Sequence, residues 1–246
     1  MDRLIYTAMT GASQTMSRLA SVGHNLANVS TTGYRAEEHR LRAVQVQSKA
    51  LPTRAFVVDA STYSDFSPGP QLYTGRQLDA SVQGPGWIAL QMPDGSEAYT
   101  RSGSLELSVN GVMQSRNSVP VMGEGGAISV PPDSKITIGR DGTVSLIPET
   151  GAQSTVNAIG RIKLVNPAEA DLVRGEDGLF RMKDGSAAPV ADDVAVAGGY
   201  LEGSNVSPVE QMVSMISLGR QFEMQMKVLS TADTNDRSAA QLFGNF

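Results

Sequence analysis

The sequence predicts an α+β protein, mainly β, with a central antiparallel β domain and a long α-helix at each end of the chain. Three observations predict this fold. Apolar residues recur with a helical period in residues 5–26 and again in residues 212–229. Between them the apolar period falls towards two, and turn dipeptides separate the runs. We expect the two helices to pair as a coiled-coil-like stalk, because neither apolar face has another partner.

The N-terminal helix is expected within residues 1–35. Apolar and small residues step by three or four along one face, at Ile5, Met9, Ala12, Met16, Leu19, Val22 and Leu26. Only Asp2, Arg3 and Arg18 carry a formal charge before residue 30. A helix with so few charges makes a poor solvated surface, so we expect it to pack on more than one side. The pattern ends before Thr31 and Thr32, whose β-branched side chains disfavour a helix.

The C-terminal helix is expected within residues 205–246, where Ser207-Pro208-Val209-Glu210 has the form of a capping box. Ser207 would be the N-cap, Pro208 the first helical residue, and Glu210 could bond back to the N–H of the cap. Its apolar face then continues at Met212, Ile216, Gly219, Phe222, Met226 and Leu229. Long helices gain most of their stability from tertiary packing, so pairing the two ends of the chain is the simplest arrangement.

The middle of the chain is expected to be an antiparallel β domain over residues 78–204. Its turn dipeptides are Asp94-Gly95, Asn110-Gly111, Asp141-Gly142, Asp177-Gly178 and Asp184-Gly185. The clearest hairpin spans residues 104–115, with a type I′ turn at Asn110-Gly111, and a second spans residues 135–147. Residues 36–77, which include SPGP at 67–70, are expected to be a connector.

Composition excludes several classes of protein. The formal charge of −5 over 246 residues argues against a nucleic-acid groove binder, which normally has a basic face. No run approaches the roughly 18 apolar residues of a membrane span, so no membrane insertion is expected. The absence of cysteine excludes disulfides, thiolate metal sites and cysteine nucleophiles. The N-terminus lacks the apolar run of a secretory signal, so export would proceed without a cleaved signal peptide.

No residue pattern for catalysis emerges. His24 and His39 are the only histidines, and neither lies in a cluster of metal ligands, so a surface or helix-end position is expected. There is no G-x-S-x-G nucleophile elbow and no P-loop. Trp87, the only tryptophan, is interpreted as a core anchor at the start of a strand rather than a sugar-binding platform. We therefore predict no enzyme activity, no cofactor and no metal site.

The stretch NLANVSTTGYR at 25–35 resembles the N-terminal motif of bacterial flagellar rod and hook proteins, N-L-A-N-x-x-T-x-G-[FY]-[KR]. Two internal blocks, at 74–90 and 98–113, resemble the entry to the β domain of that family and its Y-T-R-x-G strand. The block at 199–233 resembles its closing segment, with L-E-x-S-N-V at 201–206. Within the family, the opening MDRLIYTAMTGASQT resembles the proximal-rod branch, and the distal-rod branch is the alternative.

The resemblance implies a structural, axial component of the flagellar basal body, in the part of the rod that spans the periplasm. It implies a proximal-rod subunit that self-associates, packs with other proximal and distal rod proteins and transmits torque from motor to hook. The flagellar type III export apparatus would deliver it. Carried over residue by residue, the expected subunit-interface positions are Asn25, Leu26, Asn28, Thr31, Gly33, Tyr34, Arg35, Leu201, Glu202, Ser204, Asn205, Val206, Met212, Ile216, Phe222, Met226 and Leu229.

Two other classes of function remain open on the sequence alone. A periplasmic cell-wall hydrolase would need a recessed pair of carboxylates or an activated nucleophile, and the sequence has no pattern for either. A monomeric glycan- or protein-binding β module could use Trp87, but it would leave the two terminal helices without a role.

Overall fold

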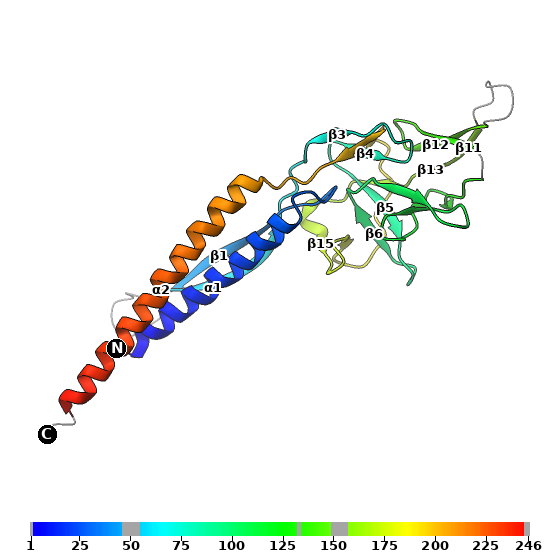
Figure 1. Cartoon of the computed structure of the whole chain (residues 1–246). Helices are drawn as coiled ribbons and strands as arrows, with labels where there is room; N and C mark the ends of the chain where they lie inside the picture. The colour runs from blue at the N-terminus through cyan, green and yellow to red at the C-terminus, as the bar shows by residue number, and fades with distance from the viewer. Residues whose placement is uncertain (1, 46–54, 132–133, 149–156, 244–246) are drawn as a thin grey trace. The chain divides into compact units, whose positions relative to one another are not determined.

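The structure is a computed structural model that describes residues 2–45, 55–131, 134–148 and 157–243 (Figure 1). The chain divides into two compact units. The helical unit comprises residues 1–29, 36–65 and 206–246, and the β unit comprises residues 30–35 and 66–205. The predicted α+β class is confirmed: the described residues contain two long helices, and every strand pairing is antiparallel.

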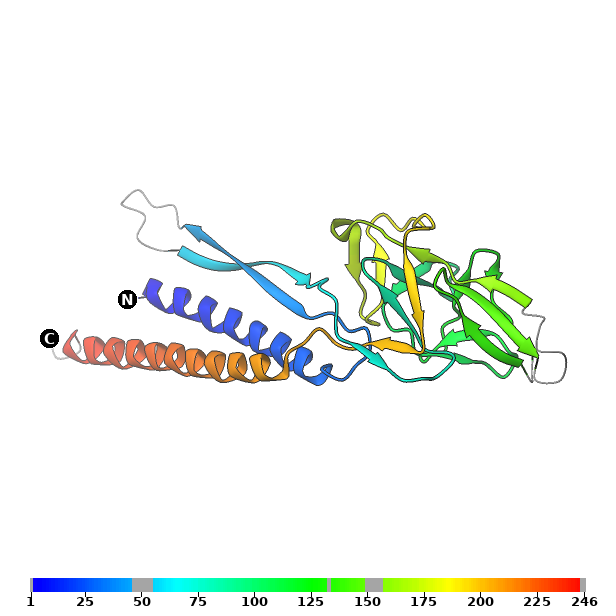
Figure 2. The ribbon, with the colours of Figure 1, turned by 90° about the horizontal axis from the view of Figure 1, so that it is seen from above.

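In the helical unit, helices α1 (Asp2–Ala27) and α2 (Pro208–Phe243) lie side by side and run in opposite directions (Figures 1 and 2). Strands β1 (Glu37–Gln45) and β2 (Ala55–Ser64) form a two-stranded ribbon, and both strands contact α1. The stretch expected to be a connector, residues 36–77, is thus divided between the units. Its first part is this ribbon, and its last part, residues 66–77, belongs to the β unit.

The predicted start of the C-terminal helix is confirmed. Pro208 is the first residue of α2, and the Ser207 hydroxyl accepts the Glu210 N–H at 3.4 Å, as an N-cap does. At the same end of the unit, α1 stops at Ala27, and the side-chain amide of Asn28 donates to the carbonyl of His24 at 2.9 Å. Asn28 thereby satisfies one of the carbonyls that the end of a helix leaves free.

The β unit is built from short strands: β3 (Gln71–Tyr73), β4 (Ala80–Gln83), β5 (Trp87–Gln91), β6 (Glu97–Thr100), β7 (Leu105–Leu107), β8 (Met113–Ser115), β9 (Met122–Gly123), β10 (Gly126–Ala127), β11 (Ser134–Ile138), β12 (Thr143–Pro148), β13 (Asn157–Arg161), β14 (Leu164–Val165), β15 (Leu172–Arg174), β16 (Phe180–Met182), β17 (Ala195–Gly198) and β18 (Tyr200–Glu202). The largest sheet has the order β14-β5-β6-β16-β15, and a second has the order β11-β12-β13. The remaining strands pair in twos, with β4 beside β17 and β3 beside β18. The C-terminal strands therefore close the unit against its first strands.

Two apolar clusters fill the β unit. The larger contains Ile88, Leu105 and Met113, all fully buried, and burial of each such side chain contributes roughly 1.5–3 kcal/mol. The smaller cluster contains Trp87, which is 4% exposed and lies 4.6 Å from Phe180 between ring centroids. The interpretation of Trp87 as a core anchor is confirmed, since a ring buried to this degree offers no face to a sugar.

The hairpin predicted at 104–115 is present as β7 and β8, but its predicted type I′ turn is wrong. Type I′ requires a positive φ at both central residues, and here Gly111 has φ +75° while Asn110 does not. Instead the Gly111 N–H donates to the Ser108 carbonyl at 2.9 Å and the Ser108 N–H donates to the Val112 carbonyl at 2.8 Å. This is a three-residue loop in which glycine takes the left-handed position. The hairpin predicted at 135–147 is confirmed as β11 and β12, with the same loop.

The four Asp-Gly turns share a side-chain contact. In each, the Asp carboxylate accepts the backbone N–H of the residue two positions later, at 2.9–3.1 Å. The pKa of each carboxyl is lowered, because hydrogen bonds stabilise its ionised form: most from the Ser96 hydroxyl at the first, the Thr143 hydroxyl at the second, the Arg181 guanidinium at the third and the Ser186 N–H at the fourth. The four are Asp94, Asp141, Asp177 and Asp184.

Candidate functional site

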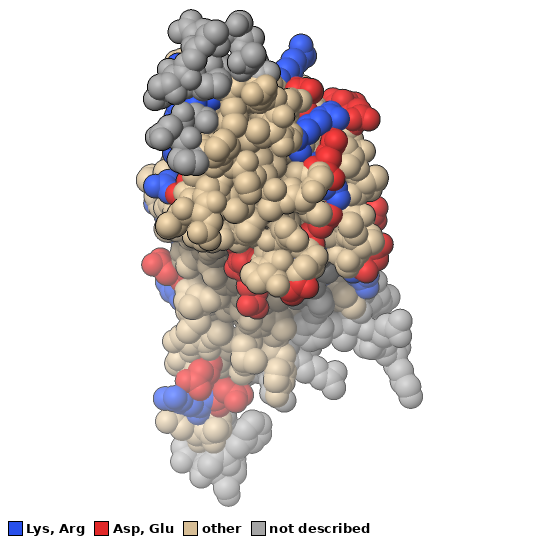
Figure 3. Space-filling view, turned by 90° about the vertical axis from the view of Figure 1, so that its right-hand side faces the viewer, with Lys and Arg blue, Asp and Glu red and all other residues tan. Residues whose placement is uncertain are grey.

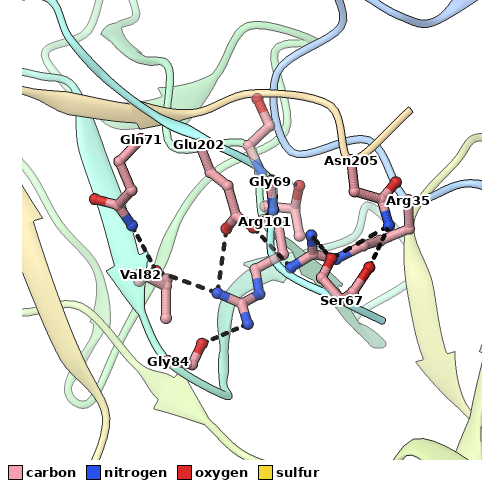
Figure 4. Close-up of polar contacts among 11 residues, drawn as sticks. Arg35, Ser67, Gly69, Gln71, Val82, Gly84, Arg101, Glu202 and Asn205 are labelled. Atoms are coloured by element: carbon pink, nitrogen blue, oxygen red, sulfur yellow. Dashed lines mark hydrogen bonds and ion pairs between the residues drawn. The ribbon is translucent and has the colours of Figure 1, made fainter. Parts of the chain in front are cut away.

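Three charged side chains from distant parts of the sequence meet inside the β unit (Figure 4). Arg35 closes the first family motif, Arg101 lies in the Y-T-R-S-G block, and Glu202 ends β18. Arg35 Nη2 lies 2.8 Å from Glu202 Oε1, and Arg101 Nη1 lies 3.2 Å from Glu202 Oε2. The three side chains are 0%, 5% and 1% exposed. They form a buried ionic junction.

The junction holds two cations and one anion, and backbone carbonyls solvate the excess positive charge. Arg35 Nη1 donates to the Ser67 carbonyl at 2.6 Å. Arg101 donates through Nη2 to the Gly84 carbonyl at 2.6 Å and through Nη1 to the Val82 carbonyl at 3.2 Å. Burial lowers the pKa of Arg101 to about 10, which leaves it charged at neutral pH. Each charge depends on the others, because an uncompensated buried charge is strongly destabilising.

Gly33 allows the first motif to pack closely against this junction. Its N–H donates to the backbone carbonyl of Glu202 at 2.8 Å, and its φ is +68°. A Cβ at this position would lie 2.3 Å from the Ser102 nitrogen and 2.4 Å from the Arg101 carbonyl carbon. Only glycine meets both conditions, a left-handed backbone and contact with the neighbouring main chain.

Tyr34 is held from two sides. The Arg174 guanidinium lies 4.5 Å above its ring, and the same arginine donates to the Arg35 carbonyl at 3.1 Å. The Asn205 N–H donates to the Tyr34 carbonyl at 3.3 Å, and the Asn205 side chain donates to the Ser67 carbonyl at 3.2 Å. The second half of the NLANVSTTGYR motif therefore folds as part of the β unit.

The first asparagine of the motif has a different task, in the helical unit. Asn25 is buried at the end of α1, and its side chain exchanges two hydrogen bonds with the backbone of Glu37. Nδ2 donates to the Glu37 carbonyl and Oδ1 accepts the Glu37 N–H, both at 2.9 Å. This pair fixes the first residue of β1 beside the last turn of α1.

The structure sorts the residues expected at subunit interfaces into three groups. Six are buried in contacts within the chain: Asn25, Tyr34, Arg35, Glu202, Ser204 and Val206. Seven are partly buried: Leu26, Asn28, Gly33, Leu201, Asn205, Phe222 and Leu229. The four exposed residues are Thr31, Met212, Ile216 and Met226. The structure thus gives the buried group an intramolecular role and leaves the exposed α2 residues available for contacts between chains.

Arg101 is a site residue that sequence reasoning missed. Its block was recognised as a family motif, but the arginine itself was not singled out. The available indication was a lone cation in AYTRSGSL, a stretch otherwise free of charge in the middle of a β core. Such a residue requires a buried acid elsewhere in the chain.

The two long helices leave large apolar side chains exposed that an ordinary amphipathic pair would bury. The side on which they face each other includes small and polar residues: Ala12 is buried, and the hydroxyl of Thr15, which is 4% exposed, donates to Gln225 Oε1 at 3.1 Å. Much larger apolar side chains point outward, at 46–68% exposure: Tyr6, Met9, Met16, Val209, Met212, Val213, Ile216, Met224, Met226 and Val228. Of the predicted stripes, Ala12 is buried, whereas Met9, Met16, Met212, Ile216 and Met226 are exposed. The last three are also among the positions expected at subunit interfaces.

No cluster of potential metal ligands occurs among the described residues, and none of their helices is long and apolar enough to cross a membrane. On the face that Figure 3 shows, acidic and basic side chains mix along one side and much of the remainder is uncharged. The face in Figure 3 shows no broad basic surface of the kind that binds nucleic acid. Among the described ion pairs, Arg161 contacts both Glu124 and Asp192.

Comparison with known proteins matches three family descriptions. Residues 5–35 match "Flagella basal body rod protein", residues 81–146 match "Flagellar hook protein FlgE/F/G D1 domain", and residues 197–242 match "Flagellar basal body rod FlgEFG protein C-terminal". The flagellar basal-body rod protein FlgF of Escherichia coli K12 is 46% identical over 98% of both chains. The chain belongs to the flagellar basal-body rod protein family.

Other members of the rod protein family are similar over the same length. FlgF of Salmonella typhimurium LT2 is 43% identical over 98% of both chains. FlgG of Buchnera aphidicola subsp. Schizaphis graminum is 29% identical, over 97% of this chain and 98% of its own. The predicted resemblance is confirmed, and with it the role of this chain as a structural component of the flagellar basal body.

The buried ionic junction joins the three segments that define the rod protein family. Arg35 is the last residue of the first matched segment, Arg101 lies in the second, and Glu202 lies in the third. The junction thus gives the charged residues of these three segments a structural role.

Proposed function

We propose that this chain is a proximal-rod subunit of the FlgF type that packs with copies of itself and with other rod proteins, and so transmits torque from motor to hook. The relatives named FlgF, at 46% and 43% identity, support the proximal position over that of the FlgG relative, at 29%. The type III export apparatus would deliver the chain to the periplasmic part of the rod without cleaving a signal peptide.

The observation that carries the proposal is the outward apolar surface of α1 and α2. Ile216 is 59% exposed and Met9 is 56% exposed, and both belong to rows of large apolar side chains. Contiguous exposed apolar surface on a soluble protein commonly marks an interaction site. In the assembled rod these rows would be buried against the helices of neighbouring subunits, and each buried side chain could contribute roughly 1.5–3 kcal/mol.

We further propose that α1 and α2 act as a coiled-coil-like stalk. Their facing positions recur at steps of three and four, as in a heptad seam: Ile5, Ala8, Ala12, Thr15, Leu19 and Val22 on α1, and Gln211, Met215, Leu218, Phe222, Gln225, Leu229 and Ala232 on α2. Polar residues at seam positions set register at a cost in stability. The Thr15–Gln225 contact would therefore fix how the outward rows of the two helices line up.

Under this proposal the helical unit forms the core of the rod and the β unit forms its outer domain. The helical unit leaves its apolar surface exposed, whereas the β unit encloses its own core, so association would complete only the helical unit. Any contribution of the β unit to the rod would then be made through its surface rather than through its core.

The proposal is tested in isolated basal bodies by quantitative mass spectrometry, in strains with and without the distal-rod gene. A proximal subunit is retained when the distal rod is missing, and a distal subunit is lost. The interface is tested in the same preparation with Ile216→Glu, which places a charge in the outward apolar row. Gln221→Glu introduces the same charge at an exposed polar position of α2 and serves as the control. If both variants were incorporated equally well, α2 would not be part of the interface.

A further inference from the structure

A hollow of about 630 Å³ opens in the β unit beside Arg101. Three loops wall it, at residues 66–68, 84–87 and 166–169. Phe66, Trp87 and the prolines of all three loops make the wall largely apolar, and Glu169 is its acidic residue. The volume lies within the roughly 300–1,000 Å³ typical of binding pockets.

The arginine in this wall has hydrogen-bond donors to spare. A guanidinium carries five N–H donors. Three are used in the junction: Nη1 donates to Val82 and Glu202, and Nη2 donates to Gly84. Nε is buried and has no acceptor among the described residues, and no dashed line leaves it in Figure 4. The two unused donors are Nε–H and the second N–H of Nη2.

Those two donors and the local charge point to one kind of ligand. Nε and Nη2 share one edge of the guanidinium, and such an edge binds both oxygens of a carboxylate. The junction also contains two arginines and a single glutamate, so a further negative charge would balance it. The negative charge of Glu169 in the wall repels a ligand with several negative charges more strongly than it repels a ligand with a single carboxylate.

We propose that this hollow docks an acidic side chain, Asp or Glu, on an extended segment of a partner protein. Its carboxylate binds the Nε–Nη2 edge of Arg101, and the residues flanking it pack on Phe66 and the proline rings, with the buried Trp87 ring behind them. The apolar wall distinguishes this partner from a small free acid, which would leave that surface uncovered. The proposal does not depend on the position of the chain in the rod.

The protein supplies its own probe, because Trp87 is the only tryptophan and lines the hollow. The full chain is titrated with the peptide acetyl-Ala-Glu-Ala-amide, with acetyl-Ala-Gln-Ala-amide and with sodium acetate, and tryptophan emission is recorded. We expect a saturable change with the Glu peptide and at least about tenfold weaker binding of the Gln peptide, since loss of the charge removes the bidentate contact. Acetate should bind more weakly than the Glu peptide.

A variant that spares the junction checks the location. Ala168→Phe places a ring in the hollow and should abolish binding of the Glu peptide, whereas Ala168→Ser should retain it; far-UV circular dichroism confirms the fold of both. Equal affinity for the Glu and Gln peptides, or unchanged binding in Ala168→Phe, would overturn the proposal. If acetate bound as tightly as the Glu peptide, the hollow would be a site for small anions, and the proposal of a protein partner would be overturned. No saturable change with any probe would show that the hollow holds water only.

Discussion

The two units of this chain place their large apolar side chains in opposite ways. In the β unit, Ile88, Tyr99 and Leu105 are fully buried, and even the charges of the ionic junction are paired inside. In the helical unit, Met9 and Ile216 are more than half exposed while Ala12 and Thr15 are buried. The β unit therefore has a complete core of its own, and the helical unit keeps its largest apolar surface for contacts outside the chain.

The test with the largest expected effect removes the anion of the ionic junction. Glu202→Ala leaves Arg35 and Arg101 buried without a counter-charge, and we expect the β unit to lose about 3–5 kcal/mol of unfolding free energy. That is a large fraction of the roughly 5–15 kcal/mol of a typical domain. Urea denaturation followed by Trp87 fluorescence measures it.

The matched control for Glu202→Ala is Glu124→Ala, which removes a partly exposed partner of Arg161. A surface pair of this kind contributes about 0–1 kcal/mol. Similar losses in the two variants would show that the buried junction stabilises the β unit no more than a surface pair does.

A second test concerns Gly33. Gly33→Val combines a left-handed backbone, which costs about 1–2 kcal/mol, with overlap against Arg101 and Ser102, which costs about 1–3 kcal/mol. We therefore expect the β unit itself to be destabilised, as a lower thermal midpoint of the isolated chain would show.

Gly84→Ala is the control for the backbone part of the Gly33 effect. Gly84 also has a positive φ, +74°, but nothing lies within 4 Å of the position its Cβ would take. We expect Gly84→Ala to lose the stability that the left-handed backbone costs, without any steric overlap. If Gly33→Val and Gly84→Ala lowered the midpoint equally, close packing at Gly33 would have no part in the effect.

A third test compares two isoleucines, one from each unit. Ile88→Val removes a methylene from a filled core and should cost about 0.5–1.5 kcal/mol in the isolated chain. Ile216→Val removes the same group from an exposed helix face, and its effect there should be within about 0.5 kcal/mol. In assembled rods we expect the order to reverse, with Ile216→Val reducing incorporation and Ile88→Val leaving it near normal. An Ile216→Val that destabilised the free chain as much as Ile88→Val would contradict the contrast between the units.

The smallest expected effect is acid sensitivity of the β unit. Hydrogen bonds lower the folded-state pKa of the turn carboxyls at Asp94, Asp141 and Asp184 below the ordinary 3.8. A lowered folded pKa contributes stability that is present above the unfolded value and is lost as pH falls through the folded one. Unfolding midpoints should therefore fall as the pH drops below about 4.

The control for the pH effect is Asp141→Asn, which keeps an acceptor oxygen for the Thr143 N–H and removes the titration. Its midpoint should depend less on pH below about 4 than that of the unmodified chain. Parallel pH curves for the two proteins would rule out a contribution from this turn.

Local rules predicted the elements better than their partners. The cap at Ser207 and the glycine turns depend on neighbouring residues, so both helices and the two clearest hairpins could be located from the sequence. The β1–β2 ribbon was missed because EEHRLRAVQ alternates poorly and is rich in charge. The predicted stripe mixed inner and outer residues, because Met9 and Ala12 lie on nearly the same arc and only the partner helix decides which one faces it.

The ionic junction was beyond prediction for a different reason. Arg35 and Glu202 were both singled out, but from family motifs that say nothing of contact. The two residues are 167 positions apart in the sequence, and no periodic pattern links them. Without that pairing, their charges were most naturally placed at a surface, where charged residues usually lie.

The position of Glu202 also determines when the chain can finish folding. About two-thirds of the polypeptide, residues 36–201, lies between Arg35 and its only acidic partner in the junction, and β17 and β18 are the strands that close the unit against β4 and β3. Contacts this far apart in sequence form slowly, because the intervening chain must first be brought together. A fragment that ends before residue 202 has two arginines and no acid to enclose with them, so the junction can form only after the chain includes Glu202.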